Sequence, residues 1–198
     1  ASGVEPGMRL ADLLRRLLDE TLVERLRLSS VEPMDFSDNL LRLMADSPRI
    51  AHHVHAPLQS ASDPVLKRMK RRYRSRHYAA RIQLAREWMP DAAIGADVMT
   101  GFPGETAEEF DQTRRFIEEM PFTYLHVFTY SERPGTPAAA YAEPVPVPVR
   151  KERNAQPVDE FRITRPLQPP ETELQRVEPG RIERQAARIR EDHEDRRF

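Results

Sequence analysis

The apolar residues of the first 140 positions alternate between two periods, and this alternation constrains the fold more than any other feature. Helical spacing occurs in four segments: 10–18, 37–44, 63–89 and 106–120. Strand-like runs lie between or after them: 25–31, 52–58, 92–99 and 122–130. Strands that alternate with helices of this length indicate βα units around a parallel sheet. The predicted fold class is therefore α/β.

A polar cluster that packing alone does not require follows each predicted strand. The clusters are residues 29–33, 57–63, 97–106 and 130–137. In parallel βα folds, ligands bind at the carboxyl ends of the strands, so we expect these clusters to form one shared pocket. The ligand-binding candidates are Ser30, Glu32, Gln59, Ser60, Asp97, Gly101, Gly104, Glu105 and Tyr130.

Some of these candidates also have a purely structural interpretation, which the sequence leaves open. Gln59 and Ser60 fit a polar loop that caps the following helix. Gly101 and Gly104 fit a tight turn that needs positive φ angles. Glu105 lies in the first turn of a predicted helix, where the helix dipole favours a carboxylate.

The histidines of the second predicted strand give no clear metal site. His53 and His55 share one face of the strand, and His52 adjoins them. A metal site needs a third ligand, and none is evident nearby in the sequence. We therefore predict no metal site, with these histidines lining a barrel or facing solvent.

A basic segment stands out in a chain that is nearly neutral overall. The 198 residues contain 31 Lys or Arg and 32 Asp or Glu, a net charge of -1, yet residues 64–86 contain many basic and no acidic side chains. The predicted phosphate-contacting residues are Lys67, Arg68, Lys70, Arg71 and Arg72. A solvated helix face is the other interpretation. Tyr73 and Tyr78 fit either base stacking or anchoring of the helix to the sheet.

Composition limits the remaining possibilities. No apolar stretch has the length needed to span a bilayer, and we predict a cytoplasmic protein without membrane contact. Cysteine is absent, which excludes disulfides and cysteine-ligated metal sites within these residues. Beyond residue 140, frequent prolines and a charged, weakly apolar composition predict a disordered tail. We thus expect a core domain at 1–140 and a tail at 141–198.

Four ordered blocks resemble one known family. They are Ser-Ser-Val-Glu-Pro (29–33), His-Ala-Pro-Leu-Gln-Ser-Ala-Ser-Asp (55–63) with Val-Leu-Lys-Arg-Met after it, Gly-Phe-Pro-Gly-Glu-Thr (101–106), and Tyr-Ser-Glu-Arg-Pro-Gly-Thr-Pro-Ala (130–138). In this order and spacing they resemble the radical S-adenosylmethionine methylthiotransferases over about residues 1–155. The residues of these blocks are most similar to those of the branch that acts on N6-threonylcarbamoyladenosine in tRNA.

This resemblance implies a fold, cofactors and a partner. It implies a partial (β/α)6 barrel that lacks its first strand, with S-adenosylmethionine bound by the candidates at the strand ends and tRNA as the partner. The first strand of the family is followed by the cysteines that hold a [4Fe-4S] cluster. No cluster ligand is present in these residues, so the resemblance assigns them no catalytic residue and predicts an inactive isolated chain. A non-catalytic α/β module that binds RNA through the basic segment is the alternative.

Overall fold

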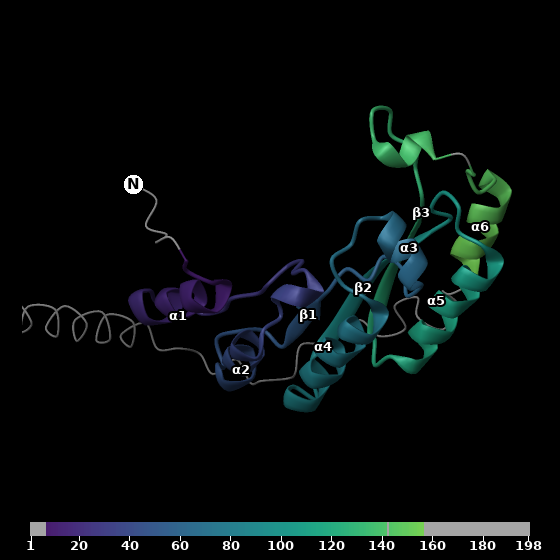
Figure 1. Cartoon of the computed structure of the whole chain (residues 1–198). Coiled ribbons are helices and arrows are strands. Elements are labelled where there is room, and N and C mark those ends of the chain that lie inside the picture. The colour runs from purple at the N-terminus through teal and green to yellow at the C-terminus, as the bar shows by residue number, and fades with distance from the viewer. Residues whose placement is uncertain (1–6, 142, 157–198) are drawn as a thin grey trace, which may run out of the picture. The chain divides into compact units, whose positions relative to one another are not determined.

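In the part of the chain that the structure describes, three parallel strands form one sheet. The computed structural model describes residues 7–141 and 143–156. The strands are β1 (His53–His55), β2 (Ala93–Thr100) and β3 (Tyr124–Thr129), and they are ordered β1-β2-β3 (Figure 1). Both strand pairs are parallel, with His55 opposite Gly95 and Asp97 opposite His126. The α/β fold class is confirmed.

The predicted helices form for the expected local reasons. The helices α1 (Leu10–Glu20), α2 (Asp38–Asp46) and α5 (Ala107–Glu119) all follow a recognisable start. Ser37 caps α2 by accepting a hydrogen bond from the Leu40 amide, and Thr106 and Glu109 form a capping box at the start of α5. Short 3-10 turns lie at Pro33–Asp35 and Pro137–Ala140. In the part of the chain that the structure describes, no helix is long and apolar enough to cross a bilayer.

The long helical region predicted for 63–89 is two helices. The first, α3 (Asp63–Arg68), ends before Lys70, whose φ of 57° is outside the helical range. The second, α4 (Ser75–Trp88), begins where the Asp63 carboxylate accepts a hydrogen bond from the Ser75 amide, at 2.9 Å. Asp63 therefore accepts a hydrogen bond from a free amide at the start of α4. The sequence instead predicted Asp63 at the start of the helix that begins at residue 63.

The strand predicted for 25–31 is not a regular strand. Leu26 forms an isolated parallel bridge with Ile50, and the Val31 amide donates to the His55 carbonyl at 3.1 Å. Between these two contacts, the Nδ1 atom of His53 lies 3.1 Å from the Leu28 carbonyl oxygen. A side chain thus replaces the backbone donor of β1, and the ladder is interrupted.

The core lies on one face of the sheet. Val54, Ile94, Ala96, Val98 and Leu125 alternate along the strands and are buried. They belong to the same apolar cluster as Tyr78, Ile82 and Ala85 of α4 and Ile117 of α5. The residues between them, including the strand histidines, lie on the other face. Each strand therefore presents one apolar face to the helices and one polar face away from them.

Regular structure continues beyond the boundary predicted at residue 140. Helix α6 (Val147–Ala155) contacts β2 and β3, because two arginines anchor it to the loop that follows β2, as described below. Residues 147–155 of the predicted tail therefore form a helix, and the domain boundary itself stays a prediction. The rest of the predicted tail, residues 157–198, lies outside the described residues, as do residues 1–6.

Candidate functional site

A cleft of about 340 Å³ lies at the carboxyl edge of the sheet. Gln59 borders it from the loop after β1, Met99 and Phe102 from the end of β2, and Thr136 from the loop after β3. Arg71 closes another side. The volume is in the range of small-molecule sites, and the predicted convergence of strand-end loops is what forms it.

Two strained residues border this cleft. Gln59 has a φ of 62° and Lys70 a φ of 57°, and they are the only non-glycine residues with positive φ in the described part of the chain. Gln59 is held in place by backbone hydrogen bonds, because its amide donates to the Asp97 carbonyl at 2.7 Å and its carbonyl accepts from the Met99 amide at 2.9 Å. Backbone strain of this kind often accompanies a ligand site.

Polar atoms without partners lie at the same place. Arg68 borders the cleft, and its buried Nε atom has no hydrogen-bond partner among the described residues. The same is true of the Tyr130 hydroxyl, on a ring packed edge-on against Phe102 with 5.5 Å between the centroids. A buried polar group without a partner costs free energy, so a ligand that supplies partners here would be favoured.

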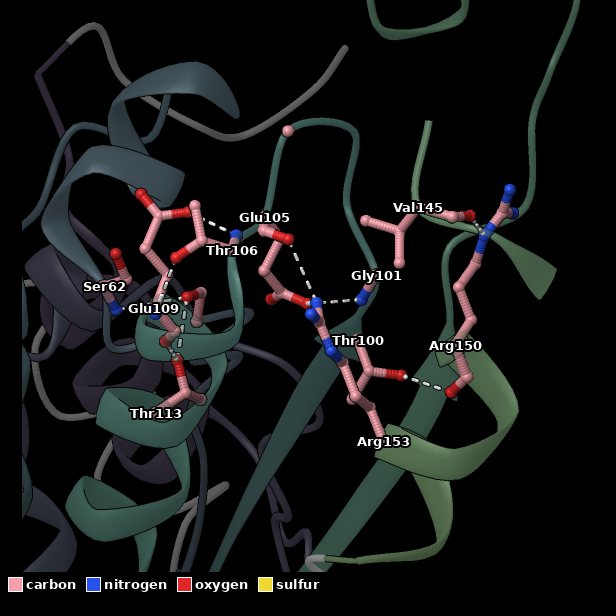
Figure 2. A network of polar contacts seen from close by, with 12 residues as sticks. Ser62, Thr100, Gly101, Glu105, Thr106, Glu109, Thr113, Val145, Arg150 and Arg153 are labelled. Carbon is pink, nitrogen blue, oxygen red and sulfur yellow. Dashed lines mark hydrogen bonds and ion pairs between the residues drawn. The ribbon is translucent and has the colours of Figure 1, made fainter. Parts of the chain in front are cut away.

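The turn after β2 is fixed from inside by Glu105 (Figure 2). Its carboxylate accepts a hydrogen bond from the Gly101 amide at 2.7 Å and pairs with Arg153 of α6 at 2.8 Å. The Glu105 side chain is only 1% exposed. Burial raises the pKa of Glu105, whereas the Gly101 amide and the Arg153 guanidinium lower it. Glu105 thus holds the turn against α6, and direct ligand contact by this residue stays a prediction.

Arg150 holds α6 against the strand ends (Figure 2). Its guanidinium donates to the Tyr130 carbonyl at 2.9 Å and to the Val145 carbonyl at 2.6 Å. A Cβ atom on Gly101 would lie 2.3 Å from Arg150 Cγ, and Gly101 has a φ of 75°. Gly101 is therefore required by both conformation and contact, whereas Gly104 shows only the positive φ and ordinary contacts. Arg150 and Arg153 were not predicted as site residues, because they lie in the segment assigned to the tail.

The remaining candidates lie elsewhere. The buried Ser60 hydroxyl bonds to Thr113 of α5 at 3.1 Å. Ser30 and Glu32 border a separate cleft of about 610 Å³, although an ion pair of 2.7 Å between Glu32 and Arg71 connects the two clefts. The structure therefore brings Gln59, the Gly101 turn and Tyr130 together at one edge, whereas Ser60 faces α5.

Asp97 belongs to a second polar group, which we call the histidine cluster: His53, His55, Asp97, Tyr124 and His126. It occupies the sheet face opposite the core. One Asp97 carboxylate oxygen lies 3.2 Å from His55 Nε2 and 3.1 Å from His126 Nδ1. The Tyr124 hydroxyl lies between His53 Nε2 at 2.8 Å and His55 Nδ1 at 3.0 Å. Burial lowers the pKa of His53. The partners of His55 come from β2 and β3, which explains why no third ligand was evident around residue 53.

The five basic candidates fall into two groups. Arg68 pairs with Glu109 at 2.5 Å and Arg71 with Glu32 at 2.7 Å. The second group is Lys67, Lys70 and Arg72. These side chains are exposed and have no hydrogen-bond or ion-pair partner in the described segments.

The two tyrosines of the basic segment anchor it to the sheet. Tyr73 and Tyr78 are fully buried. The Tyr73 hydroxyl donates to the Leu58 carbonyl at 2.9 Å, and the Tyr78 hydroxyl donates to the Ala56 carbonyl at 2.7 Å. Burial raises the pKa of both hydroxyls. Of the two interpretations of these tyrosines, anchoring is the one that the structure shows, and their rings are not available for base stacking.

The comparison with known families decides what kind of protein this is. Residues 1–117 match the family model of the Radical SAM superfamily. The chain belongs to this superfamily. Members of the superfamily use S-adenosylmethionine and a [4Fe-4S] cluster. The predicted resemblance to radical S-adenosylmethionine enzymes is thereby confirmed.

Relatives and solved structures agree with this assignment. A protein of Salinispora arenicola named tRNA-2-methylthio-N(6)-dimethylallyladenosine synthase is 46% identical over 153 residues, which cover 76% of this chain and 30% of that protein. A protein of the same name from Thermus thermophilus is 39% identical over 149 residues, 75% of this chain and 32% of that protein. The chain thus spans about a third of the length of these relatives. The radical S-adenosylmethionine methyltransferase TsrM of Kitasatospora setae shares the fold, with a TM-score of 0.52 and 20% identity over 64% of this chain and 25% of that one.

The two family cofactors differ in how they fit the residues present. The carboxyl-edge cleft offers aromatic and thioether surface from Phe102, Tyr141 and Met99 and a cationic group from Arg71. These groups fit S-adenosylmethionine, which has an adenine ring and a carboxylate. The cluster does not fit, because thiolates hold such a cluster and the 198 residues contain no cysteine.

Proposed function

We propose that this chain is the cofactor-binding and substrate-facing part of an enzyme that methylthiolates an adenosine in tRNA. The observation that supports it most is the 46% identity, over 153 residues, to a protein named for that reaction. The cleft adds to this support, since residues of three of the four family-like blocks form its borders at the strand ends. The block at 29–33 is connected to the cleft by the ion pair between Glu32 and Arg71.

The proposed S-adenosylmethionine site is the carboxyl-edge cleft. Gln59 borders it, and Phe102 and Tyr141 supply flat apolar surface for the adenine. Behind this border, Tyr130 packs against Phe102, and the Gly104 carbonyl accepts a hydrogen bond from Arg68. Arg71 is the proposed partner of the carboxylate, since a guanidinium can bind a carboxylate through two parallel hydrogen bonds. Bound S-adenosylmethionine supplies the methyl and adenosyl groups on which the family chemistry depends. Glu105 and Ser60 are proposed to position the loops that contact it.

The proposal also concerns which adenosine in tRNA is the substrate. The residues of the four blocks predict N6-threonylcarbamoyladenosine, whereas the relatives described above are named for N6-dimethylallyladenosine. We take the dimethylallyl substrate as the first candidate, because 46% identity over most of the chain is a broader basis than the wording of four short blocks. The threonylcarbamoyl branch stays a prediction to be tested beside it.

A chimaera tests the proposal directly. In the Salinispora arenicola relative, the matched 153 residues would be replaced by those of this chain, so that the rest of the relative supplies what this chain lacks. The chimaera is expected to methylthiolate tRNA, measured by mass spectrometry of nucleosides from tRNA that contains either modified adenosine. A Gln59→Ala version should lose activity mainly through weaker S-adenosylmethionine binding. A folded chimaera that binds its cluster but modifies neither adenosine would contradict the proposal.

The basic surface next to the cleft is the proposed tRNA contact. We expect the triple variant Lys67→Ala, Lys70→Ala, Arg72→Ala to bind tRNA at least ~10-fold more weakly, because it would lose three phosphate contacts. Each lost contact should also reduce the magnitude of the slope of log affinity against log salt concentration by roughly 0.7 to 0.9. Fluorescence anisotropy at several salt concentrations measures both quantities.

The matched control removes three exposed charges far from that surface in the sequence: Arg25→Ala, Arg133→Ala, Lys151→Ala. Equal weakening by both triple variants would show that only bulk charge matters and would remove the proposed contact surface.

A non-catalytic RNA-binding module is the second candidate, and the combination of zero cysteines with three unpartnered basic side chains favours it. The two functions differ in one measurement on the chain itself. A module of this kind binds tRNA but not S-adenosylmethionine, whereas the cofactor-binding part of an enzyme binds both. Calorimetric titration with S-adenosylmethionine separates them.

A further inference from the structure

The histidine cluster contains three metal-ligand side chains that converge from three different strands. His55 lies on β1, Asp97 on β2 and His126 on β3, and one ligand atom from each lies within 4.8 Å of the other two. The strand register places Asp97 directly opposite His126. Residues at paired positions of parallel strands share a face, so the sheet itself brings these side chains together.

Two of the three distances within this group match those between the ligand atoms of a bound ion. The Asp97 oxygen lies 3.2 Å from the ligand nitrogen of His55 and 3.1 Å from that of His126. An ion with tetrahedral bonds of ~2.0–2.1 Å separates its ligand atoms by roughly 3.3 Å. His126 is 59% exposed, which leaves one side of the group open to solvent.

The hydrogen bonds around His53 determine which of its own two ring nitrogens carries a proton. The Leu28 carbonyl, 3.1 Å from His53 Nδ1, can only accept, so that nitrogen donates. The Arg27 guanidinium, 3.0 Å from His53 Nε2, can only donate, so Nε2 accepts. The Tyr124 hydroxyl lies 2.8 Å from the same Nε2 atom and 3.0 Å from His55 Nδ1, so its one proton is available to either ring.

The His55 Nε2 atom faces the Asp97 carboxylate oxygen at 3.2 Å. A metal ion between these two atoms would take the Nε2 lone pair, and the His55 Nδ1 proton would then be donated to the Tyr124 hydroxyl at 3.0 Å. A histidine that donates one ring nitrogen to a neighbour and offers the other to an ion is the usual arrangement at metal sites. Gly95 makes the arrangement possible, because a Cβ atom there would lie 2.0 Å from the Tyr124 ring.

We propose that His55, Asp97 and His126 form a binding site for one divalent transition-metal ion of the Zn²⁺ type. Ions of this type bind imidazole nitrogen atoms and carboxylates, whereas Mg²⁺ and Ca²⁺ prefer ligand sets made of oxygen atoms. The ion joins β1, β2 and β3 on the face opposite the core, and its open side takes a water molecule or another oxygen or nitrogen ligand. The site is separate from the proposed S-adenosylmethionine cleft and does not depend on the proposed function.

The test uses the complete chain, produced without a histidine tag and treated with a chelator. Isothermal titration with Zn²⁺ is expected to give one ion per chain, and Co²⁺ is expected to give the visible spectrum of a four-coordinate site with N and O ligands. His126→Asn should weaken Zn²⁺ binding by at least ~10-fold, with circular dichroism unchanged because His126 is exposed. Tyr124→Phe should weaken it ~10- to 100-fold by removing the hydrogen bond that orients His55.

His52→Asn and His77→Asn are the matched controls, since both histidines lie outside the group. They should bind Zn²⁺ as the unaltered chain does. The proposal is overturned by the absence of saturable Zn²⁺ binding. It is equally overturned if His126→Asn binds normally, or if either control variant loses the ion, because the ligands would then lie elsewhere. Asp97→Asn adds a second ligand test if that variant folds, and His126→Asn decides the matter if it does not.

Discussion

Incubated with iron and sulfide without oxygen, this chain is expected to form no [4Fe-4S] cluster and to release no 5′-deoxyadenosine from S-adenosylmethionine. The physical reason is the ligand set, because the cluster is held by thiolates and the 198 residues contain no cysteine. Imidazoles and carboxylates are poor substitutes for thiolates on a cubane cluster. The expected effect is a complete loss relative to a full-length relative. Visible absorbance and chromatographic detection of 5′-deoxyadenosine measure it.

Two controls make this result interpretable. The Thermus thermophilus relative, treated in the same way, should give both cluster absorbance and product. The chain should still bind S-adenosylmethionine, more weakly than that relative does, because the cleft is present and the iron that would chelate the ligand is not. Product formation by the chain above a protein-free control would show that this account of its ligand set is wrong.

Glu105→Ala is expected to destabilise the fold by about 3–5 kcal/mol, the cost of breaking one side of a buried ion pair. The substitution leaves the Arg153 guanidinium, whose side chain is 11% exposed, without its carboxylate. It also leaves the Gly101 amide without an acceptor. Because both partners join the β2 loop to α6, we expect the carboxyl-edge cleft to loosen with them. Urea unfolding followed by circular dichroism measures the loss of stability.

Conservative and remote substitutions provide the comparison. Glu105→Gln keeps an acceptor for the Gly101 amide and should be less destabilising than Glu105→Ala. Glu118→Ala removes a half-exposed partner of Arg114 on α5, and we expect no measurable change in the unfolding midpoint, since exposed ion pairs contribute little. If Glu105→Ala unfolds at the same urea concentration as Glu118→Ala, the proposed connection between the loop and α6 does not stabilise the fold.

Local sequence signals predicted most of the elements correctly. Ser37 and the Thr106–Glu109 box marked the starts of α2 and α5, because a cap is a contact between residues three positions apart. The alternation along 92–99 and 122–130 predicted β2 and β3, since the strand period depends only on which face is buried. The clusters after these strands located the cleft, because parallel strands end at one edge of the sheet.

The errors share one physical cause, which is contact between residues far apart in the chain. The strand expected at 25–31 is interrupted because the His53 side chain takes the Leu28 carbonyl. Helix α6, in the segment predicted as a tail, contacts β2 and β3 because Arg153 pairs with Glu105 and Arg150 donates to the Tyr130 carbonyl. Neither arginine has a local signal that distinguishes it from the other charges of that segment.

The sequence by itself thus determined the α/β class, the place of the cleft and the absence of cluster ligands, because these depend on periodicity, strand direction and residue type. The tertiary structure alone decided which side chains face one another. It turned Glu105 inward to Arg153, divided the basic residues into paired and free ones, and placed His55, Asp97 and His126 around one point. The last of these outcomes follows from the register of the three strands, and register is set by packing of the whole sheet rather than by any one segment. The other two follow from the packing of helices and loops against that sheet.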